Sequence, residues 1–175
     1  MRKIILYISS TLDGFIAKPN NDLSFLEKMH IEGEDYGYAD FTSKIDTVII
    51  GSKTYQWVID QGFEYPQANK KVYVITRTEK SANGNITFYN GNVETLIKDL
   101  KSKPGKDIYC DGGAQLVNLL WQKGLIDEII LSVIPIVVGA GTKLFGQNIQ
   151  EKELKLLNNK GFSSGLVQLH YAVMT

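Results

Sequence analysis

The sequence IYCDGGAQLV, residues 108–117, joins two kinds of pattern across a glycine pair. Its first three residues are β-branched, aromatic and apolar, which is typical of a buried strand. The glycine pair marks a tight turn. Leu116, Val117 and Leu120 then form an apolar stripe with helical spacing, and Gly124 is placed to end a helix. The stretch therefore predicts a strand, a turn and a helix in direct succession.

The same succession occurs in TVIIGSKTY, residues 47–55, where an apolar run ends at Gly51 and a helix-like segment follows. Residues 3–9 and 71–76 are further continuous runs of β-branched and aromatic side chains. Runs without polar alternation indicate strands that are covered on both faces, as in a parallel sheet.

Apolar stripes with helical spacing separate these runs. The stripes consist of Tyr38, Phe41 and Ile45, and of Val93, Leu96, Ile97 and Leu100. Asn92 is placed to cap the second helix at its start, and Pro104 to stop it. Alternating strands and helices predict a parallel sheet with helices packed on it.

The last third of the chain changes character. Residues 127–138 and 166–173 both suit long strands, and the second alternates apolar with polar side chains. Such alternation is typical of antiparallel strands with one face in water. We therefore expect an α/β fold in one domain, residues 1–175. Its three layers are a mixed, mostly parallel central sheet with an antiparallel C-terminal edge, and helices on both faces.

Composition excludes several classes of protein. Lys and Arg number 19 and Asp and Glu number 19, so the net charge is zero, which argues against a nucleic-acid or membrane-surface partner. One cysteine, Cys110, excludes an intramolecular disulfide framework and fits a reducing compartment. His30 and His170 are too few and too isolated for a metal site, so no metal is expected. The N-terminal apolar run is too short for a signal peptide, and we expect a soluble cytoplasmic domain.

Three predicted strand ends carry groups that suit an anion. Gly51 is followed by Ser52, Lys53 and Thr54, and residues 76–78 read Thr-Arg-Thr. Residues 111–115 read Asp-Gly-Gly-Ala-Gln and open a helix. A helix start offers unpaired N–H groups and a positive dipole end, and glycine lets the backbone approach a ligand. Each motif alone is also an ordinary turn, and neither a P-loop nor the dinucleotide glycine fingerprint is present.

Four motifs in this order resemble the dihydrofolate reductase superfamily. They are TLDGFIA at 11–17, GSKTY at 51–55, DGGAQL at 111–116 and VGAGTKLF at 138–145. The resemblance is greatest to stand-alone relatives of the riboflavin-biosynthesis reductase domain, the C-terminal half of a bifunctional deaminase-reductase. It covers essentially the whole chain and implies a dihydrofolate reductase-like fold with NADPH as the cofactor.

The resemblance also implies roles for individual positions. Side chains along the nicotinamide would be Phe15, Ile16 and Ala17. Residues around the pyrophosphate and ribose would be Gly51, Ser52, Lys53, Thr54, Asp111, Gly112, Gly113, Ala114, Gln115 and Leu116. Thr76 and Arg77 would take the 2′-phosphate, and an arginine rewards that extra dianion.

Two departures from the superfamily pattern affect the site. Ser52 stands where dihydrofolate reductases usually have an arginine, so we expect either weaker cofactor binding or Lys53 as the substitute cation. The acid that helps to protonate the pterin has no residue in register, and Asp35 is the candidate, with helix capping as its structural alternative. Aromatic candidates for stacking on a planar heterocyclic substrate are Phe25, Tyr38, Phe41 and Trp57, and core packing is the alternative for each.

These observations leave the substrate open. The expected reaction is NADPH-dependent hydride transfer to a pteridine or to a phosphoribosylaminopyrimidine of riboflavin biosynthesis. No separate basic cluster for a ribose phosphate is evident in the sequence. Dihydrofolate reductase activity proper and a non-catalytic nucleotide-binding role are the alternatives. The long C-terminal strands need covering, so a homodimer is also expected.

Overall fold

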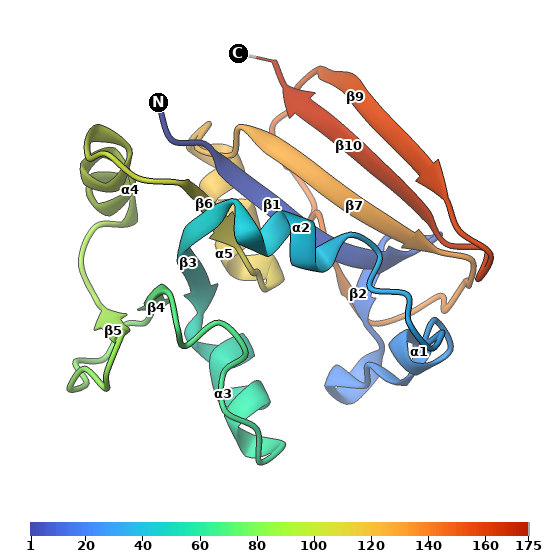
Figure 1. Ribbon diagram of the computed structural model, residues 1–175, viewed down its shortest axis with the longest axis horizontal. Helices are drawn as coiled ribbons and strands as arrows, with labels where there is room; N and C mark the ends of the chain where they lie inside the picture. The colour runs from blue at the N-terminus through green and yellow to red at the C-terminus, as the bar shows by residue number, and fades with distance from the viewer. Residues whose placement is uncertain (175) are drawn as a thin grey trace.

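An eight-stranded sheet forms the middle of the computed structural model, which describes residues 1–174 (Figure 1). The strand order is β5-β4-β3-β6-β1-β7-β10-β9. The strands are β1 (Ile4–Thr11), β3 (Ile45–Gly51), β4 (Lys71–Ile75), β5 (Ile86–Tyr89), β6 (Asp107–Cys110), β7 (Glu128–Ile134), β9 (Leu154–Gly161) and β10 (Val167–Val173). Neighbours are parallel from β5 to β7, and β10 pairs antiparallel with both β7 and β9. This confirms the mixed sheet with an antiparallel C-terminal edge.

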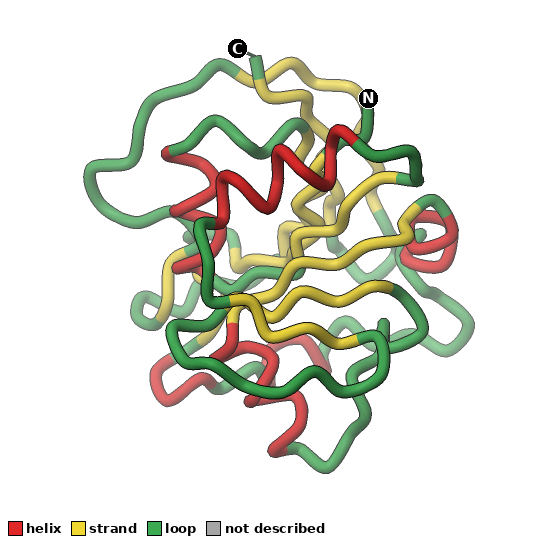
Figure 2. Tube along the Cα trace, turned by 90° about the vertical axis from the view of Figure 1, so that its left-hand side faces the viewer, coloured by secondary structure: helices red, strands yellow, loops and turns green. Residues whose placement is uncertain are grey.

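Helices cover both faces of the sheet, as Figure 2 shows. They are α2 (Tyr38–Ser43), α3 (Ser52–Asp60), α4 (Val93–Ser102) and α5 (Ala114–Gln122). Ile4 and Leu6 pack with α4 and α5, whereas Ile5 packs on the opposite face with α2 and α3. The three predicted layers are therefore present, because successive residues of a strand face opposite sides.

Short elements lie beside the end of β1. They are β2 (Phe15–Ala17), a 3₁₀ turn (Pro19–Asn21), α1 (Ser24–Glu27) and β8 (Thr142–Lys143), and β2 pairs antiparallel with β8. A Cβ atom at Gly141 would lie 2.0 Å from the carbonyl oxygen of Ala17, so only glycine lets the two segments approach. None of the helices in residues 1–174 is long and apolar enough to cross a membrane.

Some predicted boundaries were wrong. The strand expected over 127–138 ends at Ile134, where Pro135 lacks the N–H that a ladder needs. Ile45, assigned to a helical stripe, begins β3. Strands β5 and β9 were missed, and β10 is partly exposed on both faces rather than buried on one.

Candidate active site

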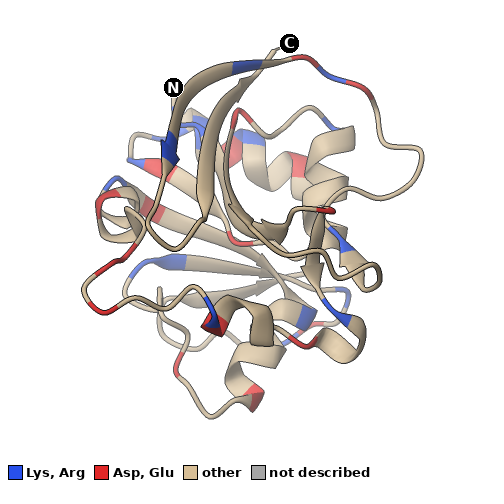
Figure 3. Ribbon diagram, turned by 90° about the vertical axis from the view of Figure 1, so that its right-hand side faces the viewer, with Lys and Arg blue, Asp and Glu red and all other residues tan. Residues whose placement is uncertain are grey.

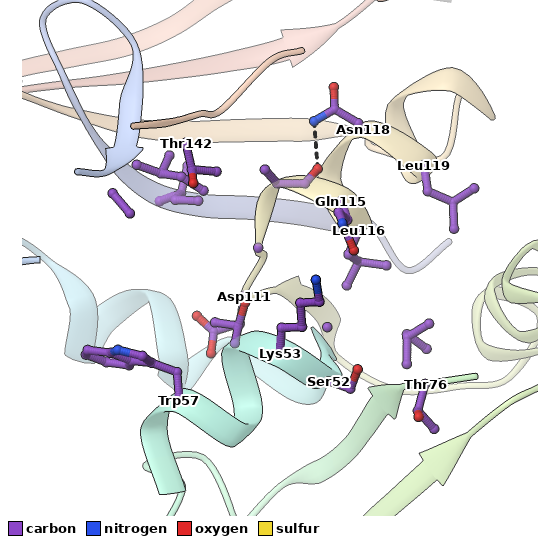
Figure 4. A pocket seen from close by; sticks show the side chains of 18 of the residues that line it. Ser52, Lys53, Trp57, Thr76, Asp111, Gln115, Leu116, Asn118, Leu119 and Thr142 are labelled. Atoms are coloured by element: carbon purple, nitrogen blue, oxygen red, sulfur yellow. Dashed lines mark hydrogen bonds between the residues drawn. The ribbon is translucent and has the colours of Figure 1, made fainter. Parts of the chain in front are cut away.

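The carboxyl ends of the parallel strands open into a cavity of about 1600 Å³. Its walls come from the segments after β3, β4, β5 and β6 and, across the cavity, from β1, β2 and α1. Ligands of open α/β sheets bind at this edge because the connections there diverge. Figure 4 shows how the side chains approach one another in this cavity.

Two helix starts meet at the centre of this edge. Helix α3 follows Gly51 and helix α5 follows Gly113, and the N–H of Gly51 donates to the carbonyl oxygen of Gly112 over 2.7 Å. Within residues 1–174, no side chain caps either start. Both therefore present free N–H groups and a positive dipole end to the cavity.

The approach of the two helices depends on glycine. A Cβ atom at Gly113 would lie 2.7 Å from Oγ1 of Thr54, inside any normal contact distance. The two helix starts therefore approach backbone to backbone, and a side chain at position 113 would fill the space between them.

Two cations stand at the same edge. Lys53 lies in the first turn of α3, and Arg77 follows β4 next to Thr76. Oγ1 of Thr76 accepts from the backbone N–H of Thr78 over 3.2 Å, which orders this turn. Of the residues the structure describes, these are the only lysine and arginine that line the cavity.

Asp111 supplies a carboxyl group in the same cavity. Its two oxygens accept hydrogen bonds from the hydroxyls of Tyr65 and Tyr109. Burial raises the pKa of Asp111, because desolvation disfavours the charged form and outweighs these hydrogen bonds. Burial, with the charge of Asp111, also raises the pKa of Tyr38 to about 12. Figure 4 shows Asp111 between Lys53 and Trp57.

Most of the predicted site residues meet in this cavity. The lining includes Ile16, Ala17, Gly51, Ser52, Lys53, Thr54, Thr76, Arg77, Asp111, Gly113, Ala114, Gln115, Leu116, Tyr38 and Trp57. Two residues expected to contact the cofactor, Phe15 and Gly112, do not line the cavity in the part of the chain that the structure describes. Phe15 is buried beneath Lys143, and Gly112 uses its carbonyl oxygen to hold Gly51.

Two of the aromatic candidates belong to the core. Phe25 is fully buried against Ile134 and Leu166, because α1 folds back onto the end of β7. Phe41 stacks on Tyr7 with ring centroids 4.6 Å apart. The prediction that these phenylalanines contact substrate was wrong, and core packing was the correct alternative.

Asp35 lies outside this cavity and caps a helix. Its carboxylate accepts from the backbone N–H groups of Gly37 and Ala39, each over 2.9 Å. These hydrogen bonds lower the pKa of Asp35, so the group is ionised near neutral pH and holds no proton to donate. The structure thus shows Asp35 in the capping position that was its structural alternative.

Several lining residues were missed by sequence reasoning. Asn90 and Gly91 follow β5 and precede α4, so they repeat the pattern of strand, glycine and helix. Recognition of β5 would have revealed them. Tyr7 and Tyr109 face the cavity from the strands, and their contribution depends on distant packing that no local motif encodes.

Comparison with known proteins agrees with this architecture. The chain is 40% identical to "Uncharacterized protein YwjB" of Bacillus subtilis over 171 residues, 97% of each chain. It is 36% identical to "Uncharacterized protein YyaP" of the same organism, over 97% of this chain and 94% of the relative.

Solved structures with this fold include a putative riboflavin biosynthesis protein from Shewanella, with a TM-score of 0.88, 25% identity and 99% of each chain covered. The deaminase/5-amino-6-(5-phosphoribosylamino)uracil reductase of Thermotoga maritima gives a TM-score of 0.73 at 16% identity. That match covers 99% of this chain and 57% of the Thermotoga chain, and shows the fold alone. A family model described as the RibD C-terminal domain matches residues 2–168. The chain therefore belongs to the RibD C-terminal domain family.

Proposed function

We propose that the protein is an NADPH-dependent reductase that transfers a hydride to a C=N bond or a ribosyl C1′ of a nitrogen heterocycle. The observation that carries the proposal is the pair of uncapped helix starts at Gly51 and Gly113, with Lys53 and Arg77 on the same edge. Membership of the RibD C-terminal domain family supports a reductase of the riboflavin-biosynthesis type.

The residues of the edge fit a dinucleotide phosphate. The N–H groups of α3 and α5, with Lys53, suit a pyrophosphate. Position 113 has no room for a side chain beside Thr54, so only glycine fits there. Arg77 and Thr76 suit a separate phosphate on the ribose. The cavity volume exceeds the roughly 300–1,000 Å³ that usually holds one small ligand, so a cofactor and a substrate fit together.

NADPH supplies the hydride when it is bound, and the chain supplies orientation and a proton. The group we assign to deliver that proton is Asp111, since burial raises the pKa of its carboxyl group above its usual value and the hydroxyls of Tyr65 and Tyr109 fix its position. A carboxyl that stays protonated nearer to neutral pH is suited to protonate a ring nitrogen as the hydride arrives. Asp111 thus takes the role for which Asp35 was the candidate.

The direct test has two parts. Titration of the purified protein with NADPH, followed by cofactor fluorescence, should give saturable binding below millimolar concentration. Absence of binding would reject the proposal. Loss of NADPH absorbance is then followed with dihydrofolate, other oxidised pteridines and the phosphoribosylaminopyrimidine. Binding without oxidation of NADPH by any of them would favour a non-catalytic nucleotide-binding role.

A further inference from the structure

A second cavity of about 830 Å³ adjoins the first. Both are lined by Tyr7, Ser9, Leu26 and Tyr38, so these residues form the boundary between them. Beyond this boundary the lining includes three acidic residues, Glu27, Glu34 and Asp35, together with His30, and within residues 1–174 it contains no lysine or arginine. Figure 3 shows red segments following one another along the loop between α1 and α2, which carries Glu34 and Asp35.

The starts of α1 and α2 differ from those of α3 and α5. At α1, the N–H of Ser24 donates to Oδ1 of Asp22 over 2.7 Å. At α2, Asp35 takes the N–H groups of Gly37 and Ala39. Both starts are already closed by carboxylates of the chain, whereas α3 and α5 are open. At the start of α2, where Asp35 lines the second cavity, an incoming phosphate would therefore find an acceptor in place of donors.

Two cations of neighbouring segments, Lys18 and Lys160, are engaged by other groups. Nζ of Lys18 lies 3.4 Å from Asp22 and donates to Oγ of Ser24 over 2.8 Å. Nζ of Lys160, whose charge reaches Asp35, sits 4.4 Å from the ring centroid of Phe162. Lys28, beside Glu27, is exposed and is part of the lining of neither cavity. Among the described lining residues the lysine and arginine are Lys53 and Arg77, which we assign to the cofactor phosphates.

The boundary between the cavities suits a flat uncharged ring. Tyr7 and Tyr38 meet edge to face with centroids 5.5 Å apart. Burial raises the pKa of Tyr7, the hydrogen bond with Gln168 opposes this, and the charges of Asp35 and Glu34 raise it further. Aromatic walls with nearby carboxylates bind neutral or protonated nitrogen heterocycles and repel anions.

We infer that the substrate is a nitrogen heterocycle without a phosphate group, bound at the Tyr7–Tyr38 boundary between the two cavities. This rests on the proposed function, since it assumes that NADPH occupies the strand-end edge. It separates the two candidate substrates, because the phosphoribosylaminopyrimidine carries a dianion that this side of the site opposes. A pteridine, or a ribosylaminopyrimidine lacking the phosphate, meets no such opposition.

The test compares matched compounds on the full chain saturated with NADPH. Calorimetry measures the binding of a pteridine, of the ribosylaminouracil and of the same compound with its 5-phosphate. At least one unphosphorylated ring should bind at least about tenfold more tightly than the phosphorylated compound. Equal or tighter binding of the phosphorylated compound would overturn the inference, as would failure of every unphosphorylated ring to bind at millimolar concentration. NADPH titration is read separately, so loss of cofactor binding identifies failure of the proposed function instead.

A charge-reversal variant tests the electrostatic cause. Glu27 is exposed at the end of α1 and lines the second cavity, so Glu27→Lys places a cation there without disturbing the core. It should strengthen binding of the phosphorylated compound about threefold relative to the unphosphorylated one. Glu151→Lys makes the same change of net charge at an exposed position outside both cavities and should alter neither. Equal effects of the two variants would show that the local carboxylates do not set the preference.

Discussion

At the scale of single residues, Asp111 combines a chemical role with a cost to the fold. Burial raises the pKa of its carboxyl group above the value in the unfolded chain. The folded state therefore binds this proton more tightly, and the stability linked to it is lost as the pH rises through the raised pKa. The ionised carboxylate of Asp111, to which we assign a chemical role, therefore lowers the stability of the folded state at neutral pH.

Asp111→Asn should consequently separate activity from stability. We expect the hydride-transfer rate to fall by about 10²–10⁴-fold, because the proton donor is removed. The melting temperature at neutral pH should rise, because the amide carries no charge to desolvate. In the parent protein, kcat should fall as the pH rises through the raised pKa of Asp111, and in the variant this limb should be absent. Stopped-flow kinetics and a thermal melt check both, and an unchanged pH profile would contradict the role.

Also at the residue scale, a variant of Arg77 tests whether the cofactor is NADPH or NADH. Arg77→Ala removes the guanidinium beside Thr76, at the predicted place of the 2′-phosphate. NADPH affinity should fall by about tenfold to a hundredfold, the usual value of a charged hydrogen bond, while NADH affinity changes little. Lys80→Ala, an exposed cation outside the described lining, is the matched control. Fluorescence titrations with both cofactors decide the matter, and equal weakening would remove Arg77 from this role.

At the scale of elements, the absence of a side chain at Gly113 sets the spacing between the starts of α3 and α5, where we propose that the anion binds. Gly113→Ala places a methyl group 2.7 Å from Oγ1 of Thr54, so the two helix starts must separate. We expect NADPH binding to weaken by at least about tenfold, with a circular dichroism spectrum that still reports the α/β fold. Adding Thr54→Ala removes the clashing oxygen and should recover part of the affinity. Failure to recover any would mean that the contact does not control the spacing.

Three strands are joined by one buried carboxylate. Glu128 on β7 accepts from Nζ of Lys3 over 2.5 Å, ahead of β1, and lies 2.8 Å from Nε2 of His170 on β10. Burial alone would raise the pKa of Glu128, but the hydrogen bonds from Lys3 and His170 lower it. Its contribution to stability is therefore present above the unfolded-state pKa and is lost as the pH falls through the folded-state value.

Glu128→Gln should therefore destabilise the protein near neutral pH and much less in acid. A loss of roughly 1–3 kcal/mol at neutral pH corresponds to a fall of about 2–9 °C in melting temperature for a chain of this length. Thermal melts from acid to neutral pH measure the difference. A constant difference across that range would show that the carboxylate charge is not the source.

The elements also show which parts of the fold local sequence can specify. The glycine turns after β3 and β6 were predictable, because strand, turn and helix signals follow one another within ten residues. Strand β9 was not, since its sequence LKLLNNKG neither alternates nor lacks polar residues, and its conformation depends on pairing with β10. The burial of Phe25 was not predictable for the same reason, since it depends on contacts with Ile134 and Leu166, far along the chain.

At the scale of the whole molecule, zero net charge conceals a division of charge across the site. Lys53, Arg77 and two open helix starts line the strand-end side, and Glu27, Glu34 and Asp35 line the far side. A molecule that is neutral overall can therefore hold an anionic cofactor at one end of its cavity and exclude an anion at the other. Binding of NADPH should weaken with salt for this reason, because only the strand-end phosphates are held by charge.

The outer edge of the sheet carries the last prediction, which concerns assembly. Strand β9 is exposed along its whole length and presents Leu154, Leu156 and Leu157, each at least 40% exposed. A long apolar edge strand has unpaired backbone groups that favour pairing with a second copy. Sedimentation at micromolar concentration should therefore give twice the chain mass of 19.6 kDa. Leu156→Lys should return the protein to monomers with its melting profile at low concentration intact, and Leu119→Lys, at an exposed leucine of α5, should leave the dimer in place. A parent protein that sediments as a monomer would show that charge and twist alone protect this edge.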